Sequence, residues 1–117
     1  MVSFIVSLFI FSTTSQRSTI VPVGRPLRTF PVTFASLSQP WRCIAYRESS
    51  DRVSVVNPVS GDGGAFQIAT LTWREYRRNN YPLNPEQATL AQQYTVAKRI
   101  EKADGWWPWV TAPLCGV

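Results

Sequence analysis

The chain changes character near residue 38, and this change limits the region that can form a packed domain. Residues 1–12 form an uncharged apolar run too short to span a bilayer comfortably, and small polar residues follow at positions 13–15. Residues 1–15 are therefore predicted to be a signal or export segment, the alternative being a buried apolar arm. Prolines with scattered Ser and Thr, and no helical period, predict a linker over residues 16–38. The domain is expected to cover residues 39–117.

The net charge of +5 is not concentrated in this domain. Arg17, Arg25 and Arg28 lie in the linker, and residues 39–117 hold nine Lys and Arg against seven Asp and Glu, a balance of +2. This balance is too weak to indicate nucleic-acid binding, and no nucleic-acid-binding motif accompanies it. A mild positive charge still favours an anionic surface such as a cell wall.

Histidine is absent from the sequence. Its absence excludes Ser-His-Asp and Cys-His catalysis and removes the commonest metal ligand. Two cysteines cannot build a zinc site alone. We therefore expect neither a metal nor a cofactor.

The two cysteines, Cys43 and Cys115, lie near the two ends of the predicted domain. In an exported protein such a pair is expected to form one disulfide. A domain this small is marginal on core burial alone, and closing a loop of about 70 residues contributes roughly 4 kcal/mol in the chain-entropy model. The alternative, two free buried thiols, requires that the chain is not exported.

An acidic residue lies in line with the apolar face of the first predicted helix, residues 41–49. Trp41, Ile44 and Ala45 fall at helical spacing, and Glu48 continues their stripe. A carboxyl directed at an apolar core is desolvated, which favours its neutral form. A neutral carboxyl can donate a proton to a leaving oxygen, as cleavage of a glycosidic bond requires. The alternative is that Glu48, near the helix end, turns to solvent.

Ser38 is the predicted cap of this helix, with Pro40 in its first turn and an end near Ser50. Valines and turn residues over 51–64 then predict a short irregular β-hairpin.

The second helix is predicted to begin at Thr70 or Thr72 and to end among residues 77–79. Thr72 and Glu75 have the spacing of a capping box.

The third helix is predicted to begin with Asn84 as its cap and Pro85 as its first residue, and to end at Gly105. Its expected buried stripe consists of Leu90, Tyr94, Ala97 and Ile100. These elements predict an α+β fold that is mostly α, with about three helices and one hairpin.

Several motifs follow one another in the order found in the lysozyme-like superfamily. They are W-x-C-x-A-x-x-E-S at 41–49, G-G-A-F-Q at 63–67, T-x-T-W at 70–73, A-T-L-A-Q-Q-Y-T-V-A-K-R-I at 88–100, G-W-W-P-W at 105–109 and L-C-G at 114–116. Over residues 40–117 the chain resembles the resuscitation-promoting-factor and small transglycosylase-like domains of actinobacterial cell-wall enzymes. The resemblance implies a small lysozyme-like domain with the hairpin beside a catalytic cleft.

The same resemblance implies that Glu48 is the general acid/base in cleavage of the β-1,4 bond between N-acetylmuramic acid and N-acetylglucosamine in peptidoglycan. It favours a lytic transglycosylase, in which the sugar's own 6-hydroxyl closes an anhydro ring, over a retaining lysozyme-type hydrolase. The implied partner is the glycan strand of peptidoglycan, and the implied location is secreted or associated with the cell wall. We expect no nucleic-acid partner, no stable membrane partner, and a monomer. The alternative is a non-catalytic wall-binding or growth-signalling module on the same fold.

The resemblance further implies substrate contacts for Gln67 and Thr72, and Gly64 is a further candidate. Trp107 could stack on a sugar or pack in the core, and we include it among the candidates. For Gln67 and Thr72 the alternative is a structural hydrogen bond to the loop backbone.

Asp62 falls where c-type lysozymes carry their second carboxylate, which would permit a retaining hydrolase. The interpretation we favour is that Asp62 bonds its own backbone within the turn Ser-Gly-Asp-Gly-Gly. Trp106 and Trp109 are predicted to pack in the core.

Overall fold

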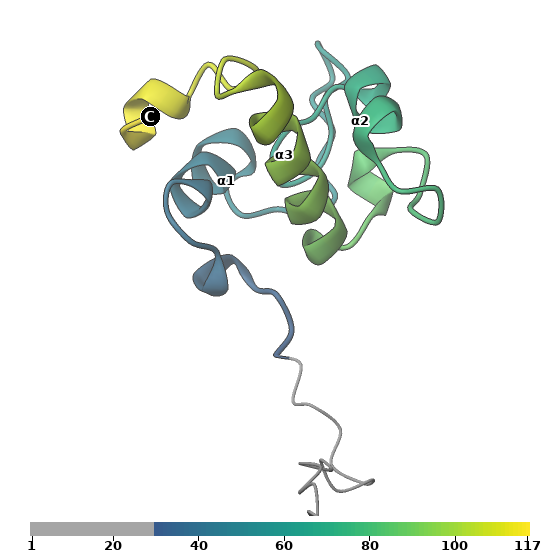
Figure 1. Ribbon diagram of the computed structural model, residues 1–117, viewed down its shortest axis with the longest axis horizontal. Helices are drawn as coiled ribbons and strands as arrows, with labels where there is room; N and C mark the ends of the chain where they lie inside the picture. The colour runs from purple at the N-terminus through teal and green to yellow at the C-terminus, as the bar shows by residue number, and fades with distance from the viewer. Residues whose placement is uncertain (1–29) are drawn as a thin grey trace, which may run out of the picture.

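The structure, a computed structural model, describes residues 30–117. It contains three α-helices, α1 (Trp41–Ser49), α2 (Thr70–Tyr76) and α3 (Leu90–Asp104) (Figure 1). Three short 3-10 helices accompany them: η1 (Phe34–Ser36), η2 (Pro85–Gln87) and η3 (Ala112–Cys115). The mostly helical fold and the three predicted helices are confirmed. The predicted export segment, residues 1–15, and most of the predicted linker lie outside the described residues.

The last residues of the predicted linker pack on the domain. Thr33 and Ser36 cap η1 reciprocally, and Phe34 contacts the core. Leu37 is itself a core residue, only 5% exposed. The folded part therefore begins before the expected boundary at residue 39.

Helix α1 has the predicted bounds but a different cap. The residue at its N-cap is Pro40, without a side-chain hydrogen bond, and the predicted cap Ser38 instead pairs its hydroxyl with that of Tyr94 at 2.9 Å. The backbone of Ser38 stays at the start of the helix, where its carbonyl accepts from Arg42 N–H at 3.2 Å, but its hydroxyl is used by Tyr94 of α3. The C-cap of the helix is Ser50, whose left-handed backbone (φ 52°) turns the chain into the next loop.

The region after α1 forms the predicted short, irregular hairpin. It contains two isolated antiparallel bridges, Val56 with Gly63 and Gly63 with Ile68, and no longer strand within residues 30–117. Backbone hydrogen bonds flank the first bridge, from Asn57 N–H to the Asp62 carbonyl (2.9 Å) and from Gly64 N–H to the Val55 carbonyl (2.8 Å). At the tip, the side-chain oxygen of Asn57 accepts hydrogen bonds from the backbone of Val59 and Ser60 at 2.9 and 3.2 Å.

Helix α2 begins at Thr70, one of the two predicted starts, and ends at Tyr76, just before the predicted range of 77–79. Its N-cap, Ala69, makes no side-chain bond, so the predicted capping box of Thr72 and Glu75 is wrong. The third helix does not run continuously from Pro85, because Ala88 is extended (ψ 156°) between η2 and α3.

Helix α3 begins with a capping box that was not predicted. Thr89 and Gln92 bond each other's backbone reciprocally, at 3.1 and 3.2 Å. The helix ends before Gly105, as predicted. The hydroxyl of Tyr76 at the end of α2 donates to Asp104 at 2.8 Å, and this hydrogen bond raises the pKa of Tyr76.

The core is built around the indole of Trp41. Its ring lies 4.8 to 6.0 Å, between centroids, from four other rings, those of Trp106, Trp109, Phe66 and Tyr94. These rings come from the loop before α2, from α3 and from the C-terminal tail. Aromatic contact therefore joins α1 to the loop before α2, to α3 and to the C-terminal tail.

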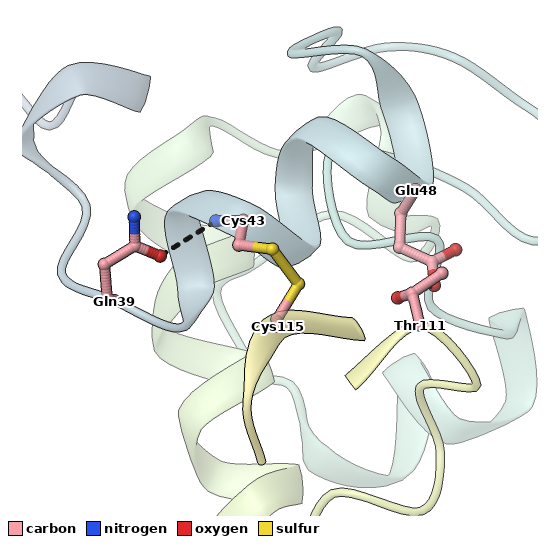
Figure 2. The surroundings of a disulfide bond; sticks show 5 residues. All are labelled: Gln39, Cys43, Glu48, Thr111 and Cys115. Carbon is pink, nitrogen blue, oxygen red and sulfur yellow. Dashed lines mark hydrogen bonds between the residues drawn. A yellow bond between two sulfur atoms is a disulfide. The ribbon is translucent and has the colours of Figure 1, made fainter. Parts of the chain in front are cut away.

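The disulfide between Cys43 and Cys115 is formed, as predicted (Figure 2). It joins the middle of α1 to η3, with 5.7 Å between the Cα atoms and a sequence separation of 72 residues. In Figure 1 the tail (yellow) accordingly lies next to α1.

Replacing both Cys43 and Cys115 by serine is expected to lower the free energy of unfolding by roughly 4 kcal/mol, because the long loop regains its freedom in the unfolded chain. Urea denaturation measures the change. Reduction of the wild type should give a similar loss, whereas exposed Ser54→Ala should give none. A double-serine variant as stable as wild type would contradict this account.

Candidate functional site

A pocket of about 270 Å³ lies between the loop before α2, the start of α2 and the tail after α3. Four predicted site residues line it: Asp62, Gln67, Thr72 and Trp107. The remaining lining residues are Ile68, Ala69, Ile100, Pro108 and Trp109. Polar groups on an apolar floor beside an aromatic ring form a surface suited to a sugar.

Glu48, at the last turn of α1, is half-buried and does not itself line this pocket. Its Oε1 atom accepts a hydrogen bond of 2.7 Å from the hydroxyl of Thr111 (Figure 2). Thr111 follows Trp109, a lining residue, by two positions in the tail. The carboxylate is therefore held by the same tail that supplies Trp107, Pro108 and Trp109 to the pocket, rather than turned freely to solvent.

The buried stripe of α1 explains the partial burial of Glu48. Trp41, Ile44 and Ala45 are buried as predicted, but the next buried position is Ser49. The Ser49 hydroxyl donates to the carbonyl of Ala45 at 2.9 Å. Glu48 thus lies on the edge of the apolar stripe, where a carboxyl keeps access to a ligand.

Gln67 makes the structural hydrogen bonds that were the alternative to substrate contact. Its amide nitrogen donates to the carbonyl oxygens of Gly64 (2.9 Å) and Val55 (3.3 Å). Its own backbone is left-handed, with φ 48°. Gln67 therefore organises the loop while its side chain also lines the pocket.

The favoured interpretation of Asp62 as a residue that bonds its own turn is wrong. Within residues 30–117 its carboxylate accepts no hydrogen bond, since Asn57 holds this turn instead. Asp62 is half-buried and its side chain is free to face the pocket that it lines.

The three tail tryptophans divide as the sequence predicts. Trp109 is 3% exposed, and its indole nitrogen donates to the carbonyl of Phe66 at 2.9 Å. Trp106 is half-buried against Trp41. Trp107 is 78% exposed and lines the pocket, so most of its ring is accessible to a ligand, whereas Trp109 lines the pocket from the core.

Gln93 is a site-forming residue that the sequence interpretation missed. Only 1% exposed, it accepts from the backbone N–H of Ala65 (2.6 Å) and donates to the carbonyls of Val53 and Ala88 (both 2.9 Å). Gln93 lies three residues after Leu90, which is the helical spacing of a buried position. A polar residue at such a position indicates a side chain that must find hydrogen-bond partners inside the domain.

Gly64, predicted to contact substrate, is buried against this glutamine and does not line the pocket. A Cβ at Gly64 would collide with the Gln93 amide, and its φ of +79° favours glycine. The substrate-contact prediction for Gly64 is therefore wrong, because the space beside its Cα is filled by the side chain that holds the loop.

Residues 30–117 contain neither a cluster of potential metal ligands nor a helix that could span a membrane. This part of the chain has no group of three or more His, Cys, Asp and Glu side chains placed to hold a metal ion. It also has no helix with both the length and the apolar character needed to cross a membrane.

A family model described as a transglycosylase-like domain matches residues 35–112, which is 78 of the 117 residues. The chain belongs to this family. The match begins in η1 and ends in η3, so this transglycosylase-like domain contains α1 with Glu48, the pocket, and the tail up to one residue past Thr111.

Similar proteins carry lysozyme and transglycosylase names. Lysozyme 1 of Musca domestica is 30% identical and Lysozyme P of Drosophila melanogaster 32% identical over 87 residues, 64% of this chain and 62% of each lysozyme. Probable transglycosylase SceD 3 of Staphylococcus saprophyticus is 35% identical over 72 residues, 61% of this chain and 30% of that protein. The chain thus spans less than two thirds of these relatives. The resemblance to the lysozyme-like superfamily is confirmed, while the likeness to resuscitation-promoting factors stays a prediction.

Replacing Gln93 by leucine is expected to lower the free energy of unfolding by about 3 kcal/mol, because one buried N–H and two buried carbonyls lose their partner. Thermal and urea denaturation measure the change. Gln87→Leu, at an exposed position, is the matched control and should change little. A Gln93 variant as stable as this control would show that the buried amide does not hold the loop.

Proposed function

We propose that this domain cleaves peptidoglycan at the β-1,4 bond between N-acetylmuramic acid and N-acetylglucosamine, with Glu48 as general acid/base. The observation that carries the proposal is a half-buried carboxylate hydrogen-bonded to the tail segment that also supplies an exposed tryptophan to the pocket. Membership of the transglycosylase-like family and the similarity to proteins named lysozyme support the same reaction.

In the first step the protonated Glu48 gives its proton to the glycosidic oxygen. The bond between this oxygen and the anomeric carbon breaks, and its electron pair stays with the departing sugar. Oε2 is the atom we assign to this transfer, because Oε1 is occupied by Thr111 and Oε2 has no hydrogen-bond partner within residues 30–117. The positive charge that develops on the anomeric carbon then faces the newly formed carboxylate.

In the second step this carboxylate takes a proton from the attacking hydroxyl, whose oxygen bonds to the anomeric carbon. We favour the sugar's own 6-hydroxyl as the attacking group, which makes the domain a lytic transglycosylase. One carboxylate suffices for this route. A retaining hydrolase is the second candidate, because the Asp62 carboxylate lines the pocket without a hydrogen-bond partner in the described chain.

The pocket supplies groups to hold the glycan. The exposed ring of Trp107 can stack on the apolar face of a sugar. The Thr72 hydroxyl can donate or accept a hydrogen bond, and the Asp62 carboxylate can accept hydrogen bonds from hydroxyl and N-acetyl N–H groups. We assign the glycan strand as the partner and a secreted or cell-wall location to the protein. A wall-binding module without turnover would use the same pocket but not the acid.

Glu48→Gln is expected to reduce the release of fragments from purified cell walls by at least about a hundredfold, because an amide cannot donate the acidic proton. Glu75→Gln, at an exposed position on α2, is the matched control. Equal activity of Glu48→Gln and wild type would remove this residue from the mechanism. Binding to walls without fragment release by wild type would favour the non-catalytic module.

Mass spectrometry of the released fragments is expected to show 1,6-anhydro ends. Fragments with reducing ends would instead identify a hydrolase, and Asp62→Asn should then reduce activity strongly. If the ends are anhydro, Asp62→Asn is expected to weaken binding without abolishing cleavage.

Trp107→Ala is expected to raise KM about tenfold, corresponding to about 1.4 kcal/mol of lost binding, with little effect on stability because the ring is exposed. Steady-state kinetics on soluble glycan fragments measure the change. Val59→Ala, which removes another exposed apolar side chain, is the control. An unchanged KM would exclude Trp107 from the binding surface.

A further inference from the structure

We infer that Thr111 is a positioning residue that fixes the carboxyl of Glu48 and directs its acidic proton toward the substrate. This inference rests on the proposed function, since it assigns a second residue to the same proton transfer. The Thr111 position has no motif of its own in the sequence, and only the folded tail brings it to α1.

The contact itself defines which oxygen carries the proton. The Thr111 hydroxyl donates to Oε1 of Glu48 at 2.7 Å, the usual distance for a well-formed hydrogen bond between a hydroxyl and a carboxyl oxygen. An oxygen that accepts this bond is the carbonyl oxygen of the protonated acid, so the proton lies on Oε2. After transfer the same hydroxyl continues to bond the carboxylate, and it therefore holds one orientation through both steps.

Tertiary contacts on both sides hold Thr111 in place. Before it, Trp109 is buried and bonded to the carbonyl of Phe66. After it, Ala112 is 1% exposed and Cys115 is bonded to Cys43. The Thr111 hydroxyl is therefore already in position before substrate binds, so binding does not have to order it.

The tail runs antiparallel to α1, and two contacts set its register. Cys43 is bonded to Cys115, and five residues later along the helix Glu48 meets Thr111, four residues earlier along the tail (Figure 2). The disulfide thus limits sliding of the tail that would separate Thr111 from Glu48. A carboxyl on a long side chain has a broad terminal torsion, so without this hydroxyl it would rotate away from the productive orientation.

The test compares Thr111→Val, which keeps the shape but loses the hydroxyl, with Thr111→Ser, which keeps the hydroxyl. We expect Thr111→Val to lower kcat about tenfold to a hundredfold with KM unchanged, and Thr111→Ser to retain most of the wild-type kcat. Thr95→Val is the matched control, because the Thr95 hydroxyl bonds only its own helix, at the carbonyl of Ala91. Kinetics on soluble glycan fragments and thermal denaturation are measured for each variant.

Wild-type kcat in Thr111→Val, with Glu48→Gln inactive, would overturn the inference and leave the proposed function intact. An active Glu48→Gln would overturn both. If Thr111→Val and Thr111→Ser lose the same fraction of kcat, and the melting temperature of both falls as well, Thr111 has only a structural role. That result would also overturn the inference. If Thr111→Val does not fold, Thr111→Ala compared with Thr111→Ser decides in its place.

Discussion

The geometry of the site depends on one buried amide. Gln93 uses both ends of its side chain to tie the loop after α1 to α3, at Val53 and Ala65, and also bonds Ala88 just before α3. Without this amide the backbone groups of Ala65 and Ala88 would lose a buried partner, so the loop has a strong reason to keep this one conformation. Because Asp62 and Gln67 lie in this loop, the amide also sets the shape of the pocket.

The C-terminal tail forms the other wall of the site. It is held by aromatic packing at Trp109, by a hydrogen bond at Thr111 and by the disulfide at Cys115, so three different interactions act within seven residues. A small domain has few core residues to spare for this purpose. Covalent and polar contacts therefore complete a surface that apolar burial alone would leave loosely packed.

Much of the fold could be predicted from local patterns. The apolar spacing gave the helices near Trp41, Trp73 and Ile100, and the positions of the two cysteines gave the disulfide. The capping residues were harder to predict. Ser38 has a side chain suited to an N-cap, but its hydroxyl bonds Tyr94 instead. Thr72 lies inside α2, whose start has no side-chain cap. The short irregular hairpin was also predictable, since valines beside a run of turn residues favour two short extended segments joined by a tight connection.

Local spacing and composition are enough to indicate where the helices form, which cysteines pair and that Glu48 lies on the apolar side of α1. They do not indicate that Thr111 meets Glu48, that Asp62 lines the pocket, or that Gly64 is buried against Gln93. These contacts join residues far apart in the chain. Their partners are selected by how the tail and the loop pack, which no local pattern encodes.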